Sequence, residues 1–126
     1  MNKELNNFKE LGDCVVLYAD NYLNDIEGEK LEIACDTFLN KGKIKVVIDF
    51  GNTELVNSIG VSILIGIMEK VREKRGVLLF SSLKKANHYV LDVLGLTKHV
   101  PVFQSEDEAL KKFLIADVQE ILIPVK

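Results

Sequence analysis

The chain has 126 residues, of which 48% are hydrophobic, and this is enough for one domain that buries most of its apolar surface. Its net charge of −3 and its dispersed Lys and Arg residues argue against the clustered basic face that nucleic acids need. No apolar run approaches the roughly 20 residues of a membrane helix, and the first ten residues lack the apolar core of a signal peptide. We therefore expect a single cytoplasmic domain spanning residues 1–126, with no direct nucleic-acid partner and no membrane insertion.

The first fifty residues predict two strands, a helix and a third strand. A run rich in β-branched residues at 14–19 indicates a strand, with residues 8–11 as its hairpin partner. Asn24 stands three residues before Glu27, a spacing typical of a helix N-terminus. Apolar residues then recur at helical spacing, at Leu31, Ala34, Cys35, Phe38 and Leu39. Residues 44–50 form a nearly continuous apolar strand, which suits the middle of a covered sheet.

A second helix is predicted over residues 60–74, and it carries two apolar stripes. One stripe contains Ile63, Leu64, Ile67 and Val71, and the stripe beside it contains Val61, Ile65 and Met68. A helix that covers one face of a sheet needs an apolar arc of only a little over 100°. The second stripe is therefore either buried by another element or available to a partner, and the sequence leaves both readings open.

The remaining elements continue the alternation of strands and helices. Residues 77–80 predict a strand, and Gly95 ends a third helix with apolar positions at Ala86, Val90, Val93 and Leu94. Residues 100–103 predict a last short strand. The capping box of residues 105–108 begins a fourth helix. Residues 117–126 contain ILIPV, which suggests an extended edge segment that could pair between chains in a homodimer.

This order of elements favours an α/β fold, with a mixed sheet of four to five strands, right-handed crossovers and about four helices. In such sheets, the loops that leave the carboxyl ends of the strands gather on one rim, where ligands and partners usually bind. Ser58 lies on this rim because it stands two residues before the predicted second helix.

Residues with obvious chemistry are few. Cys14 and Cys35 fall on apolar positions without a CxxC pattern, so we expect two buried thiols. Neither His88 nor His99 is near a motif that would make it a base, and the sequence has no nucleophile or phosphate-loop motif. We therefore expect no cofactor, no metal and no enzymatic activity. Asp49 ends a central strand, as the phosphoacceptor of a receiver domain does, but the acidic pair and late Lys of that pattern are missing.

Several landmarks, in the right order, resemble one known family. Residues 46–64, VVIDFGNTELVNSIGVSIL, resemble the signature of STAS domains, the bacterial anti-sigma factor antagonist family. The signature is an apolar strand that ends in Asp, then a short turn, then a polar residue and Ser shortly before the Gly that opens a helix. Later landmarks are FSSL, VLGL, VPVF and SEDEAL, which begin at residues 80, 93, 100 and 105. The resemblance covers roughly residues 12–115, leaves residues 117–126 as an extension, and implies a STAS-type fold.

The resemblance implies that Ser58 corresponds to a serine phosphorylated by a cognate anti-sigma factor, which is itself a serine kinase. In the family, the unphosphorylated antagonist binds the anti-sigma factor and releases the sigma factor, phosphorylation prevents binding, and a phosphatase restores it. A phosphate at a helix N-terminus is favoured by the unpaired N–H groups and the helix dipole, so we expect it to affect docking more than folding. The implied partner-binding residues are Asn24, Asn57, Ser58, Ile59, Gly60, Val61, Ser62 and Ile65.

Simpler roles remain open for the same serines. Ser58 or Asn57 could do no more than cap the helix, which contributes about 1 kcal/mol. Ser62, one turn later, is either a second candidate phosphoacceptor or a solvent-facing residue. Ser81 and Ser82 are expected to cap the third helix.

Three positions depart from the family pattern. The family commonly has Asp where this chain has Asn24 and Asn57, and a small polar residue where it has Ile59. We expect the two amides to lie on the same rim, where they remove negative charge but keep the capacity for hydrogen bonds. The change favours a divergent partner, or a non-switching module such as a scaffold or a transport-complex subunit. For the second stripe, we expect Val61→Glu to weaken partner binding with a loss of less than about 1 kcal/mol in folding.

Overall fold

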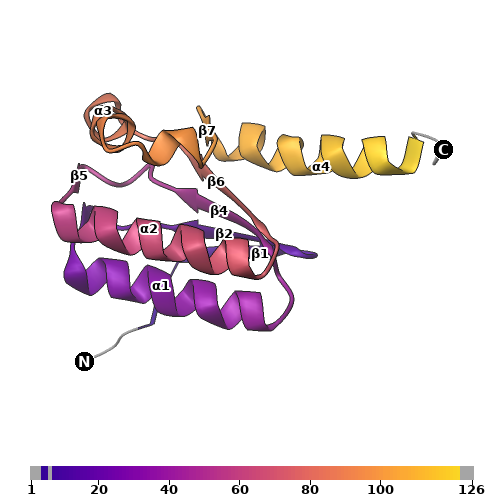
Figure 1. Cartoon of the computed structure of the whole chain (residues 1–126), viewed down its shortest axis with the longest axis horizontal. Helices are drawn as coiled ribbons and strands as arrows, with labels where there is room; N and C mark the ends of the chain where they lie inside the picture. The colour runs from indigo at the N-terminus through magenta and orange to yellow at the C-terminus, as the bar shows by residue number, and fades with distance from the viewer. Residues whose placement is uncertain (1–3, 6, 123–126) are drawn as a thin grey trace.

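The centre of the structure is a mixed five-stranded sheet (Figure 1). The computed structural model describes residues 4–5 and 7–122. The strand order is β1-β2-β4-β6-β7, with β1 antiparallel to β2 and the other neighbours parallel. These strands span Phe8–Leu11 (β1), Cys14–Tyr18 (β2), Lys45–Asp49 (β4), Val77–Ser81 (β6) and Val102–Phe103 (β7). The predicted mixed sheet and its N-terminal hairpin are confirmed.

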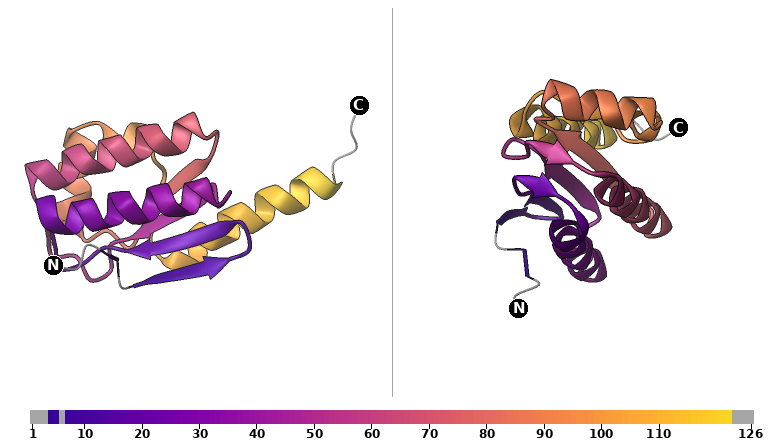
Figure 2. Two further views of the ribbon diagram at one scale, coloured as in Figure 1. Left: turned by 90° about the horizontal axis from the view of Figure 1, so that it is seen from below. Right: turned by 90° about the vertical axis from the view of Figure 1, so that its left-hand side faces the viewer.

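Helices lie on both faces of the sheet. α1 (Asp25–Asn40) and α2 (Ser58–Glu73) run side by side on one face, and α4 (Glu106–Leu122) lies on the other (Figures 1 and 2). α3 (Lys85–Val93) and the short 3₁₀ helix η1 (Leu96–Lys98) lie toward the end of the molecule where α2 begins. The four predicted helices and the α/β class are therefore confirmed. Among the described residues, no helix has both the length and the apolar character to cross a membrane.

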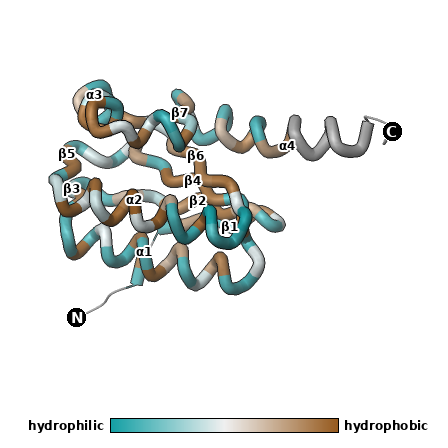
Figure 3. The backbone as a smooth tube through the Cα atoms, in the orientation of Figure 1, coloured by the Kyte–Doolittle hydropathy of each residue, from teal (hydrophilic) through white to brown (hydrophobic). Residues whose placement is uncertain are grey.

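The two faces of the sheet follow the alternation of side chains along its strands. In β2, Val15 and Leu17 belong to the core beneath α1 and α2, whereas Cys14 and Val16 belong to the core beneath α4. The central strands, brown in Figure 3, are thus covered on both sides. This double coverage explains why their sequences are nearly continuous apolar runs.

A separate two-stranded parallel sheet joins the chain segments that precede α1 and α2. β3 (Tyr22–Leu23) pairs with β5 (Leu55–Val56), with Tyr22 opposite Leu55 and Leu23 opposite Val56. These strands are not predictable from the sequence, because two residues cannot show a periodic pattern. The small sheet holds the starts of α1 and α2 next to each other.

α3 exposes the apolar positions that mark it in the sequence. Val90, Val93 and Leu94 are exposed, whereas Asn87 and Leu91 are buried. The predicted end of the helix is confirmed, because Gly95 follows it in the left-handed conformation, with φ of 83°. The more apolar side of this short helix is therefore its outer side.

The C-terminal region differs from its prediction in part. Ser105 accepts a hydrogen bond from the Glu108 N–H at 3.2 Å, which confirms the side-chain cap at the start of α4. α4 continues to Leu122, so Ile121 and Leu122 of the predicted extended ILIPV segment are helical. The rest of that segment, residues 123–126, lies outside the described residues.

Candidate functional site

Ser58 is the first residue of α2, and its side chain is exposed. The residue before it, Asn57, caps the helix: its Oδ1 accepts a hydrogen bond from the Gly60 N–H at 2.8 Å. Within the described part of the chain, the Ser58 hydroxyl makes no side-chain hydrogen bond. The capping role therefore belongs to Asn57, and the Ser58 hydroxyl is available to another molecule.

Asn24 and Asn57 lie on the same rim, as the sequence predicts. The pairing of β3 with β5 places Leu23 opposite Val56, and the two asparagines follow these residues directly. Asn24 caps α1 in the same way that Asn57 caps α2, since its Oδ1 accepts from the Glu27 N–H at 3.0 Å. The backbone also joins the two loops, because the Asn57 N–H donates to the Leu23 carbonyl oxygen at 3.1 Å. The amides of Asn24 and Asn57 thus cap the two helices as carboxylates could, but they bring no negative charge to the rim.

Four large apolar side chains are exposed around this rim. Tyr22, Ile26, Leu55 and Ile59, which we call the rim patch, have exposed fractions of 42%, 53%, 55% and 50%. The hydroxyl oxygen of Tyr22 accepts a hydrogen bond from Asn57 Nδ2 at 3.3 Å, which ties the patch to the cap of α2. Only Ile59 was a candidate from the sequence. The others were missed because an exposed apolar side chain in a two-residue strand or in the first turn of a helix leaves no periodic signal.

Not all predicted partner-binding residues reach the surface. Ser62 is exposed one turn after Ser58, and Ile65 is half-buried against the core. Gly60 is buried against β3, and Val61 is 4% exposed and belongs to the core beneath α1 and α2. The expectation that Val61 is a surface position is therefore wrong. In the second stripe of α2, Val61 is part of the core, whereas Ile65 and Met68 are half-buried at its margin.

Asp49 has a structural environment that differs from a phosphoacceptor site. Its carboxylate accepts hydrogen bonds from Ser81 Oγ at 2.7 Å, Ser82 Oγ at 2.6 Å and the Gly51 N–H at 2.9 Å, and the residue is only 8% exposed. Ser81 and Ser82 therefore bind Asp49. The expectation that they cap α3 is wrong. The residue at the N-cap of α3 is Lys84, which makes no side-chain capping bond.

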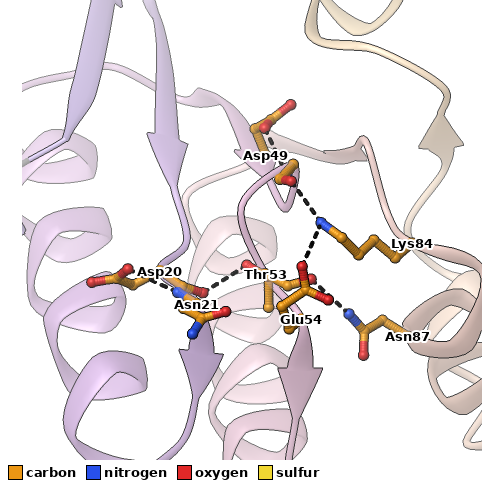
Figure 4. A network of polar contacts seen from close by, with 8 residues as sticks. Asp20, Asn21, Asp49, Thr53, Glu54, Lys84 and Asn87 are labelled. Atoms are coloured by element: carbon orange, nitrogen blue, oxygen red, sulfur yellow. Dashed lines mark hydrogen bonds and ion pairs between the residues drawn. The ribbon is translucent and has the colours of Figure 1, made fainter.

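Thr53 connects its own loop to the loop after β2 and to helix α3, behind the rim (Figure 4). Its side chain is fully buried, and its Oγ1 donates to the Asp20 carbonyl oxygen at 2.8 Å. Its own carbonyl oxygen accepts from Asn87 Nδ2 of α3 at 3.1 Å. Lys84 adds a hydrogen bond to the Gly51 carbonyl oxygen at 2.8 Å and an ion pair with Glu54 at 3.6 Å. These contacts fix the loop that leads to Ser58.

The two thiols are buried, as predicted. Burial raises the pKa of Cys14 to about 11 and that of Cys35 to about 12, so both thiols are protonated near neutral pH. Among the described residues, no group of three or more His, Cys, Asp or Glu side chains could hold a metal ion.

Comparison with known proteins agrees with this fold. The family model for the STAS domain matches residues 7–109. A curated relative, the candidate anti-sigma factor antagonist BtrV of Bordetella bronchiseptica, is 27% identical over 107 residues, which are 85% of this chain and 92% of that protein. The chain therefore belongs to the STAS domain family, and the resemblance inferred from the sequence is confirmed.

Solved structures show the same fold at lower sequence identity. A candidate anti-sigma factor antagonist from Thermotoga maritima has a TM-score of 0.77 and 22% identity, over 84% of this chain and 92% of that one. The phosphorylated form of the Bacillus cell fate determinant SpoIIAA has a TM-score of 0.67 and 19% identity, over 85% and 99%. A sulfate transporter family protein from Wolinella succinogenes has a TM-score of 0.75 and 15% identity, over 84% and 90%. At these identities, the likeness concerns the fold alone.

Proposed function

We propose that the protein is an anti-sigma factor antagonist that regulates transcription by partner switching. Its unphosphorylated form docks, through Ser58 and the rim patch, onto an anti-sigma factor that is also a serine kinase. That kinase phosphorylates Ser58 and ends the docking, and a phosphatase restores it. The protein is a cytoplasmic binding module in this scheme, and it has no catalytic step of its own.

The observation that carries the proposal is the free, exposed hydroxyl of Ser58 beside a patch of exposed apolar side chains. Asn57 already caps α2, so folding does not need the Ser58 hydroxyl. A kinase could reach it without opening the fold. The curated relative named as a candidate anti-sigma factor antagonist supports the role, and so does the phosphorylated form of SpoIIAA with the same fold.

A phosphate on Ser58 would act on docking more than on folding. It adds about −1.5 to −2 charge, which the first-turn N–H groups and the dipole of α2 stabilise. A partner that covers Ile59 and Leu55 would have to remove water from this charge, and an unpaired buried charge is costly. Phosphorylation therefore weakens docking while the free energy of unfolding stays nearly the same.

A second candidate function is a non-switching interaction module, such as a scaffold or a transport-complex subunit. It is favoured by the amides of Asn24 and Asn57, which keep both helix caps but remove the negative charge expected beside the serine. The shared fold of the sulfate transporter family protein shows that this domain type is not restricted to regulators by its architecture. The two candidate functions differ in one respect: Ser58 is phosphorylated in the switch and stays unmodified in the non-switching module.

The test is peptide mass spectrometry of the tagged protein purified from its own cells during growth, stress and starvation. A phosphate on Ser58 in at least one condition is the expected result, and Ser58→Ala should abolish it. Ser62→Ala is the matched control, because Ser62 is an exposed serine one turn along the same helix and its loss should leave the label in place. An unmodified Ser58 in all three conditions would contradict the switch and favour the non-switching module.

Binding measurements separate the two candidates a second time. In a switch, Ser58→Asp binds the co-purified partner more weakly than Ser58→Ala does, because only Asp introduces a charge at the docking surface. A scaffold would bind both variants equally.

A further inference from the structure

The outer side of α3 carries exposed apolar residues. Tyr89, Val90, Val93 and Leu94, which we call the α3 face, have exposed fractions of 70%, 37%, 63% and 56%. The helix instead buries Asn87 and Leu91. Scattered exposed apolar residues are normal, but three on one nine-residue helix and a fourth at its C-cap form a patch of the kind that marks an interaction site.

The buried polar residue of α3 explains why the helix has this orientation. Asn87 Nδ2 donates to the carbonyl oxygen of Thr53, which lies five positions before Ser58. Lys84 Nζ, just before the helix, donates to the carbonyl oxygen of Gly51 in the same loop. Both contacts are visible in Figure 4. α3 is therefore fastened to the loop that positions Ser58, with its apolar side turned outward.

The α3 face continues into a groove beside α2. Leu94 lines an open groove of about 360 Å³ together with Ile65 and Met68 of α2 and with Gly95, Leu96, Lys98 and His99. Ser58, Ser62 and Ile65 follow one another along one side of α2 at spacings of four and three residues. This side of α2 is therefore polar at Ser58 and Ser62, and it becomes apolar at Ile65, where the groove leads onto α3.

The charge around this surface differs from that of the whole chain. The chain has a net charge of −3, but residues 84–99 contain three lysines and one aspartate. Lys84 pairs with Glu54, so Lys85 and Lys98 are the exposed basic groups that remain in this segment. A partner that fits here presents apolar side chains with acidic groups at the edge, because opposite charges complement each other across an interface.

We propose that the α3 face and the groove form a second half of the docking surface, covered by the same protein that docks at Ser58. This inference rests on the proposed function. A specific interface buries about 800 Å² and about 20–30 residues on each partner, which is more than Ser58 and the rim patch can supply. The occupant is a single protein with an apolar, acidic-edged surface.

The experiment places a photo-crosslinking amino acid at Ile59, at Val93 or at Leu114 in the full chain, expressed in its own cells. Leu114 is the matched control, since its side chain is 62% exposed, against 63% for Val93. It lies on α4, on the face of the sheet opposite to α1 and α2. The expected result is the same crosslinked protein at positions 59 and 93, and its absence at position 114.

The recombinant form of that protein then gives a quantitative test. Val93→Glu should weaken its binding at least about tenfold, the scale of an interface hot spot, and Leu114→Glu should change it by less than about twofold. Val93→Lys should lose less affinity than Val93→Glu, because an acidic partner tolerates added positive charge. Equal urea midpoints for the three variants would exclude unfolding as the cause.

The outcomes distinguish the two proposals. If position 59 captures a protein and position 93 does not, or captures a different one, the α3 inference is wrong and the docking site at Ser58 stands. A second copy of this chain, or lipid, at position 93 also overturns the inference. If both positions capture the same protein but Ser58 is never phosphorylated, the shared docking surface stands and the switch fails. If neither position 59 nor position 93 captures a protein, the α3 inference and the docking site at Ser58 are both contradicted.

Discussion

Gly60 lies so close to Leu23 that a Cβ on Gly60 would be 2.4 Å from the Leu23 carbonyl oxygen. The same oxygen accepts the hydrogen bond from the Asn57 N–H at 3.1 Å. The first turn of α2 is thus in direct backbone contact with β3, and this contact sets where Ser58 stands relative to Asn24. A side chain at position 60 would have to move one element away from the other.

Gly60→Ala should therefore destabilise the protein. Because the obstructing atom belongs to the backbone, it cannot rotate away, and we expect a loss of about 1–3 kcal/mol in the free energy of unfolding. Gly66→Ala, later in the same helix, is the control: the nearest atom to its added Cβ is a glutamate side-chain oxygen at 3.5 Å. That change should stabilise by about 0.5–1 kcal/mol, because Ala is the better helix former. Urea unfolding of both variants measures the difference, and equal midpoints would disprove the close contact.

The cap of α2 should tolerate a carboxylate but not the loss of its oxygen. Asn57→Asp keeps an acceptor for the Gly60 N–H, so we expect a change within about 0.5 kcal/mol. Asn57→Ala removes the acceptor and should cost about 1 kcal/mol. Thermal or urea unfolding checks both values. A large loss for Asn57→Asp would show that the contact between Asn57 Nδ2 and the Tyr22 hydroxyl matters more than the cap.

Local patterns in the sequence predict most of the elements. The central strands are continuous apolar runs because both sides of the sheet are covered, and such runs are visible in the sequence. The caps at Asn24 and Ser105 were found because a capping side chain binds a backbone N–H three residues later, which is a local relationship. The position of Ser58 at the start of α2 followed in the same way.

Contacts between distant segments were not predictable from such patterns. The pairing of β3 with β5 and the hydrogen bond from Asn87 to Thr53 join segments more than 30 residues apart. The inner face of α3 carries that bond, so hydrophobicity alone does not identify this face. Asp49 was considered as a phosphoacceptor because it ends a central strand. Its partners Ser81 and Ser82 were not predictable, because they lie in another strand and in the loop after that strand.

The burial of Val61 reverses the expectation that Val61→Glu has little effect on folding. With 4% exposure, Val61 has no room for a carboxylate in contact with water, and a buried unpaired charge is strongly unfavourable. We expect Val61→Glu to lower the free energy of unfolding by more than about 3 kcal/mol. Ser62→Glu, at the exposed neighbouring position, should change it by no more than about 0.5 kcal/mol. Circular dichroism during urea unfolding compares the two, and similar midpoints would place Val61 at the surface after all.

The buried thiols should be unreactive in the native protein. Thiolate is the reactive form, and desolvation raises the pKa of Cys14 to about 11 and that of Cys35 to about 12. At pH 8 we expect neither thiol to react with an aromatic disulfide reagent until urea unfolds the chain, when both should react. The absorbance of the released thiol counts them. Reaction of one thiol in the folded protein would reveal local opening of the core around it.

The same shifts give a pH dependence of stability. Both folded-state pKa values lie above the ordinary value of 9.0, so the native state keeps protons that the unfolded chain releases. Their stabilising contribution is complete below about pH 9 and falls as the pH rises toward 11 and 12. Because Tyr and Lys residues also titrate in this range, the comparison is between the wild type and Cys35→Ala. The Cys35→Ala variant starts from a lower stability but should lose less of it than the wild type between pH 8 and pH 10.5. Equal losses in the two proteins would mean that the Cys35 thiolate is as well solvated in the folded chain as in the unfolded one.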